Sequence, residues 1–236
     1  MPSRKILFRL VPLVLMLIFC HTLSAEAKID KWSDTNYPFK SIKAVYIENI
    51  KLAAPGLSDI ETKNLQTDFW KQVNREQPYT VITYEQLIRK LSLSEGRNLD
   101  ALRNSNPAAF DDYMRNNMSR VVTAYAKTVM DEYKIGSYVV PAHTEWRTRY
   151  VKDHYYDRDG NRHETTREER YPEFVPERTV YTDTIHMRLD VYDAKTHQVI
   201  FSREEYRTDD NSRDLSGMFG EITRGCLRDF REKISD

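Results

Sequence analysis

Histidine and acidic side chains gather around one short segment, and by type they are the residues best suited to chemistry. His154 and His163 flank residues 157–161, which read Asp-Arg-Asp-Gly-Asn. Two imidazoles with a carboxylate such as Asp159 could bind zinc, or could serve as base and acid in a hydrolase. A zinc site normally shows a third ligand at a recognisable spacing, and these histidines have none. We expect no catalytic and no metal-binding residue here, with a hydrolase using His154, His163 and Asp159 as the alternative.

The same segment contains oxygen side chains that calcium could use, namely Asp157, Asp159, Asn161 and Glu164. An EF-hand loop places glycine at its sixth position and a bidentate glutamate at its twelfth. Counted from Asp157, Gly160 is the fourth residue, so the spacing does not fit. Asp-Gly is instead a strong signal for a hairpin turn. The segment predicts the turn of a long hairpin, and we expect no cofactor.

Cys226 is the remaining candidate nucleophile. Apolar residues spaced three or four apart surround it, and together they are Leu215, Phe219, Ile222, Cys226 and Phe230. This spacing predicts an amphipathic helix with one buried side. A reactive thiolate needs a cationic neighbour, and none can be read from the local sequence. We therefore interpret Cys226 as a core thiol.

Aromatic side chains are interleaved with basic ones around the predicted hairpin. Such mixtures occur in sites for single-stranded nucleic acid and for sugars. Between positions 143 and 178, however, eight lysines and arginines accompany nine acidic residues, and the whole chain has 36 of each kind. No general field therefore attracts nucleic acid or anionic lipid. A protein-facing or a solvent-facing ribbon remains, and we expect it to be an interaction element, with surface attachment as a further alternative. The candidate partner-binding residues are Trp146, Tyr150, Tyr155, Tyr156 and Tyr171.

The elements that must position these residues follow a β-α-β-α pattern in the first half of the chain. Apolar, β-branched runs at 41–50 and 79–84 predict two strands. Ser58 and Glu61 match a capping box that opens a helix over 59–74. A second helix is expected at 84–93. The polar residues 94–106 then predict a mobile connection.

A long amphipathic helix is predicted from Pro107 to Tyr133. Asn106 would cap it, Pro107 would occupy its first position, and Gly136 would end it. Its buried side would consist of Phe110, Met114, Val121, Tyr125, Val129 and Tyr133. A third strand is expected to follow from residue 137.

Two strands and a helix close the predicted sheet. Ile185, Met187 and Leu189 alternate with polar residues, so the strand has one buried face. His186 falls on its polar face, where we expect it to be solvated rather than catalytic. The turn DAKTHQ reverses the chain into 199–206. The predicted fold is mixed α/β, β-α-β-α and then a β-hairpin sheet with a closing C-terminal helix, plus an inserted hairpin at about 146–178.

The amino terminus predicts a secretory signal. Basic residues precede an apolar run over 10–20 that is too short for a comfortable membrane span. Ala25, Glu26 and Ala27 supply the small-x-small pattern of a cleavage site, so cleavage is expected between Ala27 and Lys28. The chain then divides into a signal peptide at 1–27, a polar lead-in at 28–40 and a single domain at 41–236. An uncleaved segment, the alternative, would be the expected membrane contact.

Cys20 does not fit a lipid-attachment signal. Phe19 precedes it, whereas bacterial lipoprotein signals have a small residue at that position. If Cys20 leaves with the signal, Cys226 is the one cysteine of the mature chain and cannot form an internal disulfide. Stability must therefore come from packing.

Four stretches carry a family resemblance, and they are FKSIKAVYIENI, YTVITYEQL, YKIGSYVVPAH and IHMRLDVYDAKTHQVIFS. Together they resemble the bacterial envelope family of the curli secretion lipoprotein CsgG and the TolB amino-terminal domain, over most of 41–234. The resemblance implies an exported, non-enzymatic envelope protein, periplasmic or at the cell surface. It also implies action by binding or assembling with other envelope proteins, self-association included.

Two departures limit what the resemblance implies. His197 stands where the family turn usually has glycine, and histidine tolerates a left-handed backbone at modest cost. The long hairpin and the missing lipid signal both separate this chain from the pore-forming members. The resemblance therefore implies the fold and not the pore.

Overall fold

A computed structural model describes residues 26–210 and 214–235 of the protein. Gly136–Tyr181 forms one compact unit, and the residues before and after it form the other. The predicted mixed α/β class is confirmed, because the described residues contain a mixed sheet of seven strands, a separate two-stranded hairpin and a C-terminal helix. The predicted signal segment falls on residues 1–25 and the first two residues after them, so nearly all of it lies outside the described part.

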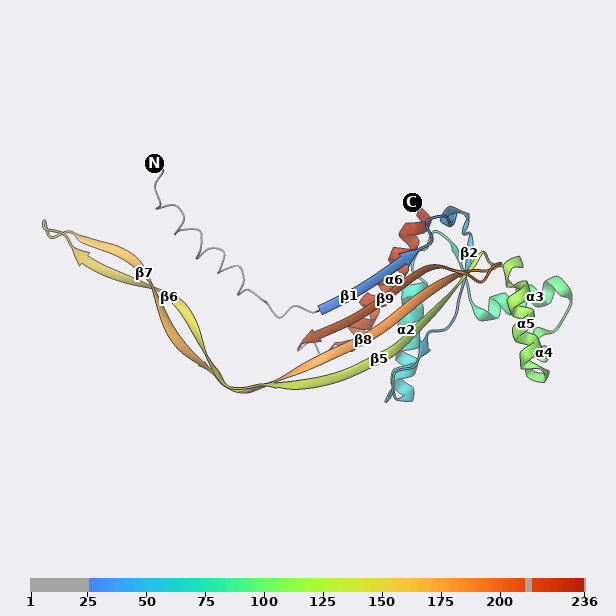
Figure 1. The fold of residues 1–236 in the computed structure, drawn as a ribbon, viewed down its shortest axis with the longest axis horizontal. Coiled ribbons are helices and arrows are strands. Elements are labelled where there is room, and N and C mark those ends of the chain that lie inside the picture. Colours follow the sequence, from blue (N-terminus) through green and yellow to red (C-terminus); the bar gives the residue numbers. More distant parts are fainter. Residues whose placement is uncertain (1–25, 211–213, 236) are drawn as a thin grey trace, which may run out of the picture. The chain divides into compact units, whose positions relative to one another are not determined.

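The main sheet combines parallel and antiparallel strands. They are β1 (Glu26–Ser33), β2 (Ala44–Ile47), β3 (Lys51–Leu52), β4 (Thr80–Ile82), β5 (Ala124–Val140), β8 (Arg178–Asp193) and β9 (Val199–Asp210). Their order is β1-β9-β8-β5-β2-β4, with β3 beside β5 (Figure 1). β2 is parallel to both β4 and β5, whereas β9 is antiparallel to β8 and to β1. The parallel strands require crossover connections, which the helices supply.

Five α-helices lie in the described chain, and their bounds are α2 (Asp59–Val73), α3 (Tyr84–Glu95), α4 (Leu99–Ser105), α5 (Pro107–Asn117) and α6 (Leu215–Ser235). Short 3-10 turns occur at η2 (Phe39–Ser41) and η3 (Met118–Arg120). The predicted capping box opens α2, since the Ser58 backbone N–H donates to the Glu61 carboxylate at 2.9 Å. A second box, between Thr83 and Gln86, opens α3.

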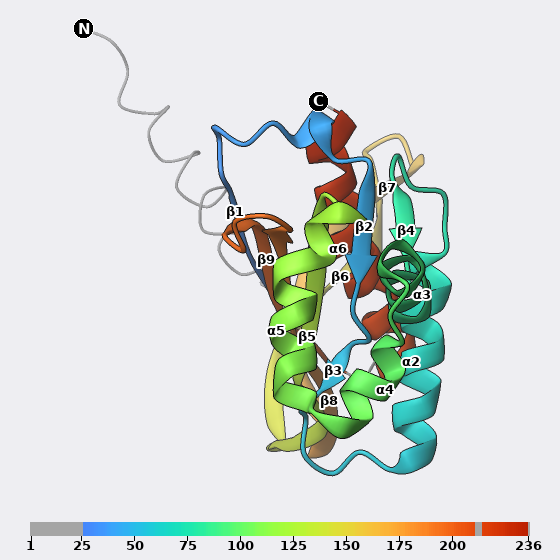
Figure 2. The same ribbon diagram turned by 90° about the vertical axis from the view of Figure 1, so that its right-hand side faces the viewer.

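Helices pack on both sides of the parallel strands. Val45 and Ile47 of β2 belong to a core shared with α2 and α6, while Tyr46 between them packs with α3, α4 and α5. Because side chains alternate along a strand, the two helix groups lie on opposite faces of β2. Figure 2 shows α3, α4 and α5 gathered as one group.

The predicted long helix from Pro107 to Tyr133 is wrong. Helix α5 ends at Asn117, and strand β5 begins at Ala124. Tyr125, Val129 and Tyr133 are four residues apart, a spacing that keeps side chains on one side of a strand as well as of a helix. Periodicity alone therefore did not separate the two. Gly136 lies inside β5 and ends no helix.

Two polar segments are ordered elements. Residues 94–106, expected to be a mobile connection, include α4, whose Asn98 side chain accepts the Ala101 N–H at 3.0 Å and whose Leu99 is fully buried. Residues 28–40, expected to be a lead-in, include most of β1, which pairs with β9 along its whole length. Alternating charges in β1 suit an edge strand, where one side faces water.

The predicted long hairpin is confirmed. Strands β6 (His143–Tyr156) and β7 (Arg162–Val175) are antiparallel and pair from His143 opposite Val175 to Tyr156 opposite Arg162. At the turn the Asp157 N–H donates to the Asn161 carbonyl at 3.0 Å. Gly160 has φ +82°, a conformation that residues with a Cβ rarely adopt.

Candidate functional site

The two faces of the β6–β7 hairpin, called here the ribbon, differ in their aromatic content, although both carry charged residues. Opposite residues of an antiparallel pair share a face, and successive residues alternate between faces. Trp146 lies opposite Pro172, and two positions along the strand Thr144 lies opposite Phe174. One face of the ribbon therefore carries Phe174, Trp146 and Pro172 together.

Two tyrosines extend this aromatic face, which we define as Trp146, Tyr150, Tyr156, Pro172 and Phe174. Tyr150 and Tyr156 are an even number of positions from Trp146 and share its side of β6, with Lys152 and His154 between them. The four rings are unusually open, with exposed fractions of 70% for Trp146, 71% for Tyr150, 69% for Tyr156 and 70% for Phe174. Exposed apolar side chains grouped on one surface are typical of interaction sites.

The opposite face of the ribbon, called here the charged face, is built from ion pairs. Arg149 pairs with Glu169 at 2.9 Å, and Arg167 pairs with Asp153 at 2.6 Å. Arg147 pairs with Glu173 across the two strands. Solvent-exposed pairs of this kind each contribute little to stability. In each of these pairs, an arginine on one strand faces a carboxylate on the other strand.

The five predicted partner-binding residues divide between the two faces. Trp146, Tyr150 and Tyr156 lie on the aromatic face, whereas Tyr155 and Tyr171 lie on the charged face. Tyr155 stacks on His163 with ring centroids 5.2 Å apart, and the Arg149 guanidinium lies 5.3 Å from the centre of the Tyr171 ring. Sequence reasoning missed Phe174, because its place beside Trp146 depends on the register between the two strands.

The residues considered for metal binding or hydrolysis do not converge. His154 lies opposite Glu164 and His163 opposite Tyr155, so the two imidazoles are on opposite faces of the ribbon. The Asp157 carboxylate is used by the turn itself. It accepts the Asn161 N–H at 2.8 Å and lies 2.8 Å from His163 Nε2, and the hydrogen bond to His163 is the main cause that lowers the pKa of Asp157.

The Asp159 carboxylate takes part in none of these hydrogen bonds. The Asp159 backbone N–H donates to the Asp157 carboxylate at 3.0 Å. Throughout 26–210 and 214–235, no group of three or more His, Cys, Asp or Glu side chains is arranged to hold a metal ion. The hydrogen bonds of Asp157 therefore serve to close the turn between β6 and β7.

The ribbon has no hydrophobic core of its own. Within Gly136–Tyr181, Val180 is the one buried residue. A two-stranded hairpin that buries no face is marginally stable in water. The ribbon therefore exposes apolar side chains, and burying them against a partner surface would stabilise the hairpin.

Cys226 lies in a buried ionic network that the local sequence did not reveal. Burial raises the pKa of the Cys226 thiol to about 11, although the neighbouring Arg203 guanidinium acts in the opposite direction. Arg203 Nη1 lies 3.0 Å from Cys226 Sγ, and Arg203 also pairs with Glu205 at 2.6 Å and Asp229 at 2.7 Å. A buried thiol with a raised pKa is a poor nucleophile. The interpretation as a core residue stands.

His186 joins three strands on the polar side of the sheet. Its Nδ1 lies 2.6 Å from an Asp131 oxygen in β5, and its Nε2 lies 2.6 Å from a Glu204 oxygen in β9. Both ring nitrogens are thus occupied by carboxylates of neighbouring strands. This arrangement links strands and leaves no ring nitrogen for a substrate.

Neither a family model nor a curated protein matches this chain in sequence. Among solved structures, the chain is similar to the PelC dodecamer from Paraburkholderia phytofirmans, with TM-score 0.44 and 10% identity over 87% of this chain and 98% of that one. It is also similar to lipoprotein GNA1162 from Neisseria meningitidis, with TM-score 0.36 and 9% identity over 78% and 94%. Likeness at this level transfers neither family nor function, and the resemblance to CsgG and TolB stays a prediction.

Within the described residues, no helix is both long enough and apolar enough to cross a membrane.

Proposed function

We propose that this chain is an exported, non-enzymatic protein of the bacterial envelope that assembles with further copies of itself through the aromatic face of the ribbon. The observation that carries the proposal is the exposure of about 70% at each of Trp146, Tyr150, Tyr156 and Phe174. Burying aromatic side chains of this size releases free energy on the order of 2 kcal/mol each. The ribbon has no hydrophobic core of its own, so burial of these side chains against a partner would stabilise its fold.

A second copy is the partner that the surface suits best. The ribbon carries nearly equal numbers of basic and acidic residues, so two ribbons do not repel each other through net charge. Within the described residues, β6 and β7 form a sheet of two strands alone, so the outer edge of each is open to pairing. Contact between the aromatic faces of two ribbons uses the same surface on both copies, so it produces a symmetric dimer.

Light scattering coupled to size-exclusion chromatography tests this proposal. A variant with Trp146→Ser, Tyr150→Ser and Phe174→Ser should be monomeric at concentrations where the unmodified protein is oligomeric. The matched control is Arg149→Ser with Glu169→Ser, which removes an ion pair from the charged face and leaves the net charge unchanged. The control should keep the oligomer.

Folding of the core is checked separately. All five substituted side chains are exposed or partly exposed, so thermal unfolding of the main sheet should stay within about 3 °C of the unmodified protein. A monomeric unmodified protein at all concentrations would reject self-assembly. An oligomer that survives the triple substitution would show that the aromatic face is not the interface.

A further inference from the structure

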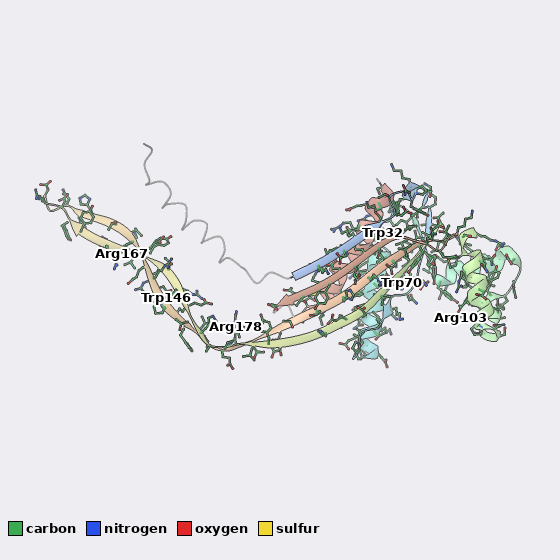
Figure 3. The ribbon with its side chains drawn as sticks, in the orientation of Figure 1. Trp32, Trp70, Arg103, Trp146, Arg167 and Arg178 are labelled. Carbon is green, nitrogen blue, oxygen red and sulfur yellow. The ribbon has the colours of Figure 1, made fainter. Side chains whose placement is uncertain are left out.

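A cavity of about 630 Å³ opens at the carboxyl ends of the parallel strands β2 and β4. Tyr46 lies within β2 and Glu48 just beyond its end, while Thr83 and Tyr84 directly follow β4. Trp70 of α2 and Arg103 of α4 complete the walls and are labelled in Figure 3. The volume is within the range of small-molecule sites, roughly 300–1,000 Å³.

The position of the cavity follows from the chain topology. The chain leaves β2 through α2, which packs with the core on one side of the sheet. It leaves β4 through α3, α4 and α5, which pack on the other side. Because the two outgoing connections diverge, a crevice remains between the carboxyl ends of the two strands. Open α/β sheets bind ligands at this kind of switch point.

Aromatic rings form a large part of the wall. Tyr46, Trp70 and Tyr84 come from three different elements and border the same space. Tyr46 is buried, and burial is the main cause that raises its pKa, with the Glu48 carboxylate contributing. Flat apolar surfaces of this kind suit a ligand with an apolar face.

Planar polar groups surround these rings. Burial raises the pKa of Glu48, and Lys127 Nζ at 3.7 Å opposes that effect. The Asn49 side-chain oxygen accepts the Trp70 indole N–H at 2.8 Å, which leaves the Asn49 amide N–H groups as donors. Arg103 adds a guanidinium 5.2 Å from the centre of the Tyr84 ring, and Glu85 adds a second carboxylate.

The mixed charges of this lining favour a neutral ligand over a strongly charged one. An anion would meet Glu48 and Glu85, and a cation would meet Arg103 while competing with Lys127 for Glu48. An uncharged polyhydroxylated ring satisfies both signs, since each hydroxyl donates to a carboxylate and accepts from a guanidinium or amide N–H. Its C–H face can also pack on an aromatic ring.

We propose that the cavity binds a neutral sugar ring of the pyranose class. The proposal is independent of the ribbon, because every lining residue lies in the larger unit. Glu48 and Arg103 would hold the hydroxyls, and the rings of Trp70 and Tyr84 would contact the C–H face.

Tryptophan fluorescence provides a direct readout. The chain has three tryptophans, and of these Trp70 lines the cavity whereas Trp32 and Trp146 are not among its lining residues. The full chain is titrated with methyl β-glucopyranoside, methyl β-galactopyranoside and methyl N-acetyl-β-glucosaminide. At least one should change the emission saturably. Trp70→Phe should abolish the change, whereas Trp32→Phe and Trp146→Phe should retain it.

Calorimetry with the same glycosides measures affinity without the fluorophore. Arg103→Ala and Glu48→Gln should each weaken binding about tenfold or more, the loss expected for a hydrogen bond to a charged group. Lys71→Ala, on the exposed side of the helix that carries Trp70, should leave binding unchanged. The proposal fails if no glycoside binds, if the emission change persists in Trp70→Phe, or if tetramethylammonium binds in place of every glycoside.

Discussion

At the scale of single residues, the most consequential feature is the charge network beneath α6. Arg203 and Glu205 of β9 are 2% and 0% exposed, and they point into the core rather than to solvent. Arg203 is held by Glu205 and by Asp229, which also pairs with Lys31 of β1 at 2.7 Å. Removing one member of such a buried set typically costs about 3–5 kcal/mol, because a charge is left uncompensated.

Gly225 has no side chain, and the Arg203 guanidinium occupies the space beside it. A Cβ built at Gly225 would lie 2.9 Å from both terminal nitrogens of Arg203, whose guanidinium two carboxylates hold in place. Glycine inside a helix normally costs about 1 kcal/mol relative to alanine. Here the side chain that alanine would add meets a group that is not free to move.

We expect Gly225→Ala to lower the free energy of unfolding by about 1–3 kcal/mol, as overpacking usually does. Gly220→Ala is the matched control in the same helix, because its Cβ would meet Gln72 Nε2 at an ordinary 3.7 Å. The control should raise the free energy of unfolding by about 0.5–1 kcal/mol. Urea denaturation measures both, and equal stabilisation by the two substitutions would contradict the role assigned to Gly225.

At the scale of elements, the turn between β8 and β9 shows how local chemistry sets a hairpin. The Asp193 carboxylate accepts the Lys195 N–H at 2.9 Å and the Thr196 N–H at 2.7 Å, and the Tyr37 hydroxyl donates to it at 2.8 Å. His197 has φ +58°, so it occupies a left-handed position of the turn. The expectation that histidine tolerates this position is confirmed.

Substitutions at His197 test the cost of that conformation. His197→Val should lower the free energy of unfolding by about 1–2 kcal/mol, because a β-branched residue is strained at positive φ. His197→Gly should change it by less than about 0.5 kcal/mol, since the relief of strain is offset by loss of the contact with Tyr125. Thermal unfolding of the two variants compares them. A valine variant as stable as the glycine variant would show that the turn rearranges.

At the scale of the whole molecule, the predicted export signal overlaps with strand β1 of the fold. Ala27 lies opposite Arg207 and Lys28 opposite Tyr206, so the predicted cleavage site falls within a paired strand. A protease needs an accessible, extended segment, which a strand paired in the sheet does not offer. Cleavage is therefore expected on the unfolded chain, before β1 joins the sheet.

Mass spectrometry of protein recovered from the envelope should give a mature chain that begins at Lys28 and carries no acyl group. Ala27→Tyr should block processing, because the residue before the cleaved bond must be small. Ala27→Ser should be processed normally and serves as the control. A diacylglycerol adduct on Cys20 would contradict the prediction.

Sequence alone determined the features that depend on neighbours a few residues apart. The Ser58 capping box, the alternation of Ile185, Met187 and Leu189, and the turn at Gly160 all came out as predicted, because each is set by contacts within one turn or one strand. The amphipathic pattern of α6 belongs with them, and it placed Cys226 in the core correctly.

Tertiary structure alone decided the features that depend on partners distant in the chain. Residues 124–133 are a strand because β2 and β8 flank them, and β1 is a strand because β9 offers it an open edge. Strand register, not spacing, put His154 and His163 on opposite faces and grouped Phe174 with Trp146. The network around Arg203 and the cavity beside Trp70 likewise join segments far apart in sequence. Periodicity predicts which side of an element is buried, but it does not predict which residues pack against that side.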